Sequence, residues 1–97
     1  MLYFVMDLDV PTLEEDLAQL SSMNEVELRD VIVTRGEAVR KKISEAVVRT
    51  EAEDDRKTRD GWEAFALVSR LEEYKDLEML RNAAGRIVVL DHARSLG

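Results

Sequence analysis

Apolar and polar residues alternate at the start of the chain. Every even-numbered position from 2 to 10 is apolar, whereas the odd-numbered positions include Asp7 and Asp9. A period of two with aromatic and branched residues predicts a half-buried β-strand. A lone strand leaves backbone N–H and C=O groups unpaired, so we expect it to pair with residues 86–90, whose sequence is RIVVL, or with another chain.

The pattern changes to a helical period after Pro11. Thr12 and Glu15 fit a capping box, in which the threonine oxygen accepts a hydrogen bond from an early backbone N–H and the glutamate bonds back. Leucines at positions 13, 17 and 20 then form one apolar stripe. The spacing predicts a short helix that ends near the sequence SSMN at positions 21–24, where Ser22 with Glu25, or Asn24 with Glu27, offers the next helix start.

A second helix is expected over about residues 25–50. Its apolar stripe runs through Leu28, Ile32, Val39, Ile43, Ala46 and Thr50. The β-branched run VIVT at 31–34 and the glycine at position 36 weaken this interpretation, because glycine inside a helix costs about 1 kcal/mol relative to alanine. The alternative is that this helix breaks at Arg35–Gly36.

A third helix follows over residues 62–84. Its stripe runs through Trp62, Phe65, Val68, Leu71, Tyr74, Leu77, Leu80 and Ala84, and we expect Trp62 to close one end of the core. The polar stretch 51–60 separates the two long helices, and the simplest arrangement places it at or near the bend of a helical hairpin. Residues 86–96 read either as a strand or as a continuation of the helix. The expected fold is a single, mainly α domain over 1–97, with a short N-terminal helix, a long helical hairpin and a small β element.

Composition and charge narrow the class of protein. The chain has 97 residues, no cysteine and a net charge of −7. Disulfides and thiolate metal sites are excluded, and the acidic balance argues against nucleic-acid binding, which depends on phosphate neutralisation. No apolar run approaches the ~20 residues of a membrane helix, and the start of the chain lacks the basic region of a signal peptide. We therefore expect a protein of the cytoplasm, or of a virion interior, with no membrane contact.

Two pairs of carboxylates offer the main catalytic alternative. The members of each pair lie three residues apart, Glu51 with Asp54 and Glu73 with Asp76. This spacing places both carboxylates of a pair on one helical face. On antiparallel helices the two pairs could hold Mg²⁺. This pattern is similar to that of the all-α nucleotide pyrophosphohydrolases of the MazG type, although the first pair lacks the additional glutamate and the lysine found there. The resemblance covers these four residues and implies Mg²⁺-dependent hydrolysis of nucleoside triphosphates.

The preferred interpretation is non-catalytic. Charge is segregated, since residues 1–34 carry eight acids against one base while residues 35–50 carry five bases against two acids. Single helical stripes, a strand that needs a partner and an acidic front predict self-association, or docking of the kind seen in assembly components and acidic inhibitors. No cofactor is expected, and His92, the only histidine, is assigned to the surface or to packing. The candidate binding residues are Phe4, Glu14, Glu15 and Asp16.

Overall fold

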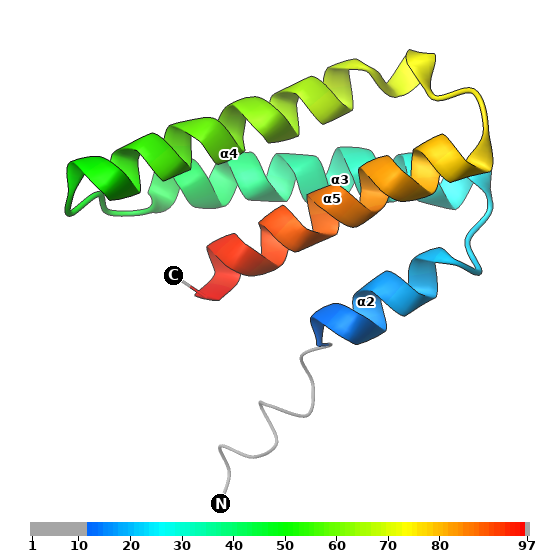
Figure 1. Cartoon of the computed structure of the whole chain (residues 1–97), viewed down its shortest axis with the longest axis horizontal. Coiled ribbons are helices and arrows are strands. Elements are labelled where there is room, and N and C mark those ends of the chain that lie inside the picture. Colours follow the sequence, from blue (N-terminus) through cyan, green and yellow to red (C-terminus); the bar gives the residue numbers. More distant parts are fainter. Residues whose placement is uncertain (1–11, 97) are drawn as a thin grey trace, which may run out of the picture.

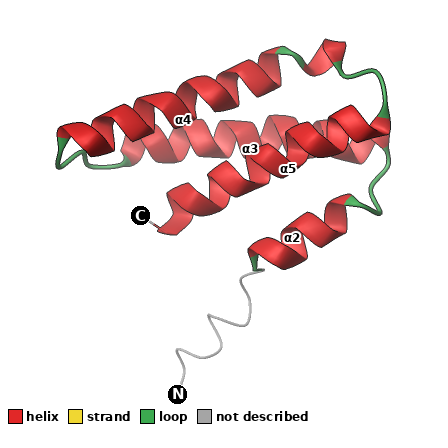
Figure 2. Cartoon of the chain, viewed as in Figure 1, coloured by secondary structure: helices red, strands yellow, loops and turns green. Residues whose placement is uncertain are grey.

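The described part of the chain is helical throughout. The structure is a computed structural model, and it describes residues 12–96. Four α-helices and one 3-10 turn follow one another, with no strand among these residues (Figures 1 and 2). The elements are α2 (Leu13–Leu20), α3 (Glu25–Glu45), α4 (Glu51–Ser69), the 3-10 turn η1 (Leu71–Glu73) and α5 (Leu77–Leu96). The mainly α fold expected from the sequence is confirmed for this part of the chain.

The first two helices begin where their capping signals lie. The Thr12 side chain accepts a hydrogen bond from the Glu15 backbone N–H at 3.2 Å and starts α2. Asn24 and Glu27 form a complete capping box at the start of α3, with bonds of 2.9 and 3.1 Å. Of the two starts that the sequence offered for this helix, the asparagine is the one used. Such caps satisfy backbone donors that would otherwise lack a partner.

Helices α3 and α4 form the expected hairpin, and its bend lies directly before the polar stretch 51–60. They run side by side in Figure 1, joined by residues 46–50. The polar stretch 51–60 is not the bend; it forms the first half of α4, which starts at the N-cap Thr50. Acidic residues in a first helical turn interact favourably with the helix dipole, which accounts for a charged stretch at this place.

The alternative of a helix break at Arg35–Gly36 is wrong. Helix α3 continues through it, and Gly36 is buried against α4 and α5. A Cβ at this position would lie 2.5 Å from Val68 Cγ2, closer than side chains pack. Glycine here permits the close approach of neighbouring helices, which outweighs its poor helix propensity.

The continuous helix expected over 62–84 is interrupted. Helix α4 ends at Ser69, and η1 leads into a connection before α5. Arg29 donates to the carbonyl oxygens of Leu71 and Tyr74 at 2.8 and 3.0 Å, and the Tyr74 hydroxyl donates to the Leu67 carbonyl at 2.8 Å. These bonds give three carbonyls near the end of α4 hydrogen-bond partners where the regular helix stops.

Helix α5 includes residues 86–90, so of the two alternatives that the sequence left open here, strand or helix, the structure has the helix. Ala83, Ala84, Ile87, Val88 and Leu90 are all buried, because α5 packs against α2, α3 and α4 at once. A helix that is surrounded in this way reads as a continuous apolar run, which periodicity alone does not distinguish from a buried strand. The predicted N-terminal strand, with Phe4, lies outside the described residues.

The core has two parts that share Leu67. The larger collects Leu20 of α2, Leu28 and Ile32 of α3 and the buried face of α5. The smaller joins Val39, Ala64 and Leu90 of the three long helices. Within residues 12–96, no helix combines the length and the apolarity that a membrane crossing requires.

Candidate functional site

The structure divides the predicted acidic face. Glu14 and Glu15 are exposed on the first turn of α2. Asp16 points inward instead, and its side chain is only 13% exposed. Of the three acids expected to meet a partner, one is committed to contacts inside the molecule, and Phe4 lies outside the described residues.

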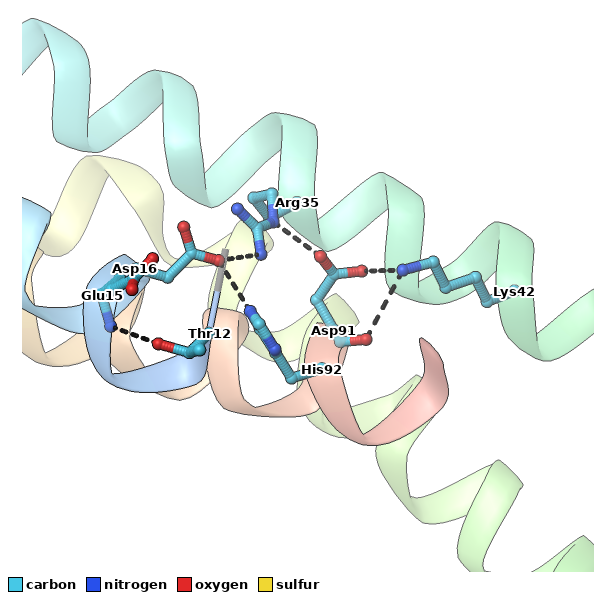
Figure 3. Close-up of polar contacts among 7 residues, drawn as sticks. All are labelled: Thr12, Glu15, Asp16, Arg35, Lys42, Asp91 and His92. Carbon is cyan, nitrogen blue, oxygen red and sulfur yellow. Dashed lines mark hydrogen bonds and ion pairs between the residues drawn. The ribbon is translucent and has the colours of Figure 1, made fainter. Parts of the chain in front are cut away.

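Asp16 belongs to a network of charged side chains that joins three helices (Figure 3). Its Oδ2 lies 3.0 Å from Arg35 Nη2 on α3 and 2.6 Å from His92 Nε2 on α5. Arg35 Nε donates to Asp91 Oδ2 at 2.6 Å, and Lys42 Nζ donates to Asp91 Oδ1 at 2.6 Å. Two carboxylates and two permanent cations thus alternate across the junction of α2, α3 and α5.

The electrostatics of this network favour the charged forms of Asp16 and Arg35. Burial alone would raise the pKa of the Asp16 carboxyl, but hydrogen bonds from His92 and Arg35 outweigh it, so the pKa lies below its ordinary value. Burial would lower the pKa of Arg35, yet the bonds to Asp16 and Asp91 raise it above its ordinary value. Each charge at this junction has an opposite charge beside it, which is the condition for burying ions in a stable fold. We assign the network to holding α2 and α5 on α3.

Sequence reasoning left this network out. Asp91 follows the apolar run IVVL and was not singled out, and His92 was assigned to the surface or to packing. The available signal was a charged residue inside a buried run, because a buried charge requires a partner. The identity of the partners comes from the crossing of helices far apart in sequence.

The four carboxylates of the alternative metal site do not converge. Glu51 and Asp54 lie in the first turn of α4, whereas Glu73 and Asp76 lie beyond its other end. Helix α4 has 19 residues, which at 1.5 Å per residue places the two pairs roughly 28 Å apart along its axis. Within the described residues, no group of three or more acidic or histidine side chains is arranged to hold a metal ion. The geometry that the resemblance to the pyrophosphohydrolases requires is therefore not formed by these residues.

A further surface feature is a hollow between α3 and α4, which we call the aromatic hollow. Its volume is about 350 Å³. It is lined by Arg40, Ile43, Lys57, Thr58, Gly61, Trp62 and Phe65.

Two aromatic rings and one cation shape the aromatic hollow. Trp62 is 67% exposed and Phe65 is 46% exposed. Their ring centroids lie 6.0 Å apart at 89°, an edge-to-face contact. The Arg40 guanidinium carbon lies 5.4 Å from the Phe65 centroid, within the range of a cation–π interaction. The rings are thus held in place by each other and by Arg40 while much of their surface faces solvent.

The position of Trp62 corrects its sequence assignment. We expected it to close the core, but α4 turns Ala64 and Leu67 inward instead, and Trp62 lies on a different face of the helix. If the apolar stripe begins one residue earlier or later, a different face of the helix is predicted to be buried. The sequence around Gly61 therefore did not show whether the face with Trp62 or the face with Ala64 and Leu67 is buried. The aromatic hollow was missed for this reason.

Comparisons of the chain with protein-family models, with curated proteins and with solved structures found no match.

Proposed function

We propose that this protein is a non-catalytic interaction protein, which binds another protein chain through the aromatic hollow. The observation that carries the proposal is the exposure of Trp62 beside Phe65 on the α3–α4 hairpin. Exposed apolar surface is unfavourable in water and marks binding sites when large side chains gather in one place. Tryptophan and arginine are also the residues that most often dominate the free energy of protein–protein binding.

Position and chemistry of the lining residues support the same function. Arg40 offers a guanidinium that can bond a carboxylate while it remains on the Phe65 ring. Gly61 leaves room in the hollow, because this position of α4 has no side chain over Ile43. A bulky apolar side chain from a partner would find an aromatic wall, an apolar floor and a cation at the edge. A stable interface buries roughly 800 Å² on each partner, so we expect the contact to extend beyond the hollow over the surface of α3 and α4.

The test replaces the exposed rings and measures association separately from folding. In Trp62→Gln and Phe65→Gln, we expect helicity and melting temperature to stay near wild type, because neither side chain is part of the buried core. Association with a second chain should be lost or reduced about ten-fold or more. It is measured by sedimentation velocity and by cross-linking in cells from a photoreactive residue at position 58, which lines the hollow and is exposed.

The matched control is Val26→Gln. Val26 is 75% exposed on α3 and lies outside the aromatic hollow, so its replacement removes exposed apolar surface at a different place. A photoreactive residue at position 26 should give no protein adduct. If Trp62→Gln keeps full association, or if it melts far below Val26→Gln, the hollow is not the binding site and the proposal fails.

A further inference from the structure

The aromatic hollow has a defined chemical preference. Its lining residues include two cations, Arg40 and Lys57, and no acid. Its floor and walls are apolar, from Ile43, Trp62 and Phe65. Burial of an apolar side chain at the floor combined with a carboxylate at the edge would match both properties, because charge complementarity at an interface favours the correct partner and rejects others.

A second aromatic hollow does not meet this preference. If two copies met hollow to hollow, Arg40 and Lys57 of each would face the same cations of the other, with no lining acid to receive them. Like charges brought together across an interface are unfavourable. The occupant is therefore a different surface, one that carries apolar side chains and acids.

Residues 2–10 of this chain carry that chemistry in their sequence. They lie outside the described residues, and their even-numbered positions are all apolar, including Phe4. They contain Asp7 and Asp9 and no basic residue. Phe4, Asp7 and Asp9 offer the apolar anchor and the two carboxylates that the hollow lacks.

The same copy is poorly placed to fill its own hollow. Helix α2, which follows this segment, packs against α5, whereas the hollow lies between α3 and α4. In Figure 1, α2 and α4 lie on opposite sides of the molecule, with α3 and α5 between them. Helix α2 thus lies across α3 and α5 from the hollow of its own copy, which favours a segment supplied by a neighbouring copy.

We propose that the aromatic hollow is occupied by residues 2–10 of a second copy, and that two copies exchange these segments about a two-fold axis. The proposal rests on the proposed function and names the partner as the chain itself. Exchange fills both hollows and places Asp7 and Asp9 of each copy beside Arg40 of the other. It also uses Phe4, the residue that sequence reasoning assigned to binding.

Disulfide trapping tests the contact directly. The chain has no cysteine, so a mixture of full-length Phe4→Cys and full-length Thr58→Cys forms a mixed disulfide only between those two positions. We expect this cross-linked heterodimer under mild oxidation. The matched control is Arg59→Cys, which lies next to Thr58 on α4, is exposed, and does not line the hollow; mixed with Phe4→Cys it should cross-link at least about ten-fold more slowly, because bond formation requires the two β-carbons within about 4.5 Å.

Charge reversal provides a second test in the full-length protein. We expect Arg40→Glu to raise the dimer dissociation constant about ten-fold, and the neighbouring control Lys41→Glu to change it less than about two-fold. Asp7→Lys with Asp9→Lys should weaken the dimer similarly. A chain that carries Asp7→Lys, Asp9→Lys and Arg40→Glu together should regain dimer formation, because lysines of one copy then meet the glutamate of the other.

The outcomes separate the two proposals. The segment exchange is overturned if wild type sediments as a monomer at all concentrations, if the Phe4→Cys and Arg59→Cys pair traps as well as the Thr58→Cys pair, or if the combined charge reversal does not restore association. If one of these is observed while Trp62→Gln still abolishes binding to another protein, the proposed function stands and the occupant is a different chain. If Trp62→Gln leaves every association intact, the proposed function fails as well.

Discussion

Replacement of Gly36 by alanine should destabilise this protein, contrary to the rule for glycine in a helix. In the middle of a helix, glycine to alanine normally stabilises by about 1 kcal/mol. At position 36 the added Cβ would lie 2.5 Å from Val68 Cγ2 and 3.3 Å from Ile87 Cδ1. Val68 cannot turn away easily, because a valine in a helix has one strongly preferred rotamer.

The size of the effect follows from two opposing terms. Forcing a methyl group into a packed core costs roughly 1–3 kcal/mol. Set against a propensity gain of about 1 kcal/mol, the expected net loss is about 1 kcal/mol in the free energy of unfolding. The control is Gly61→Ala in α4, where the nearest atom to the added Cβ is Ile43 Cδ1 at an ordinary 3.6 Å. That variant should gain about 0.5–1 kcal/mol, so the two substitutions differ in sign.

Urea denaturation followed by circular dichroism at 222 nm measures both variants. A double-mutant cycle with Val68→Ala adds a second measurement. If the methyl group at position 36 strikes Val68, then Val68→Ala should cost less in the Gly36→Ala background than in wild type. Equal stabilisation by Gly36→Ala and Gly61→Ala would refute the close packing of α3 against α4 and α5, and so would a cycle with no coupling.

Three further outcomes are expected. Asp91→Asn removes one of the two carboxylates that Arg35 contacts in the network, and it should lower the free energy of unfolding by about 2 kcal/mol. Urea denaturation measures this loss, and a value below about 0.5 kcal/mol would contradict the assigned role of the network. Because the pKa of Asp16 is lowered in the folded state, its contribution to stability is fully present above the ordinary carboxyl value, ~3.9, and is lost as pH falls through the folded pKa. Melting temperatures at pH 7 and below pH 4 should therefore differ less in Asp16→Asn than in wild type, and an unchanged pH dependence would refute this contribution. Glu51, Asp54 and Asp55 are exposed acids near the start of α4. Replacing all three by their amides should change the free energy of unfolding by no more than about 1 kcal/mol, and neither protein should respond to Mg²⁺ in its melting temperature. A Mg²⁺-dependent rise in the melting temperature of wild type alone would instead support the hydrolase alternative.

Local chemistry in the sequence determined where two of the helices begin and that the described part of the chain is mainly helical. Thr12 and the Asn24–Glu27 pair were identified as starts because a cap is formed by residues three apart in sequence, which meet as soon as the first helical turn forms. The apolar residues Leu28, Ile32 and Val39 were likewise assigned to one buried face, and all three are buried. Signals of this kind depend on a few consecutive residues.

Tertiary packing decided the rest. Residues 86–90 are helical because α5 is surrounded by three other helices, and a central helix carries the same apolar run as a buried strand. Gly36 continues a helix because its neighbours approach too closely for a side chain. The pairing of Asp16 with Arg35 and His92 joins residues 19 and 76 positions apart. The exposure of Trp62 depends on which face of α4 meets α3 and α5, a choice made by the summed packing of three helices and not by the sequence around the tryptophan.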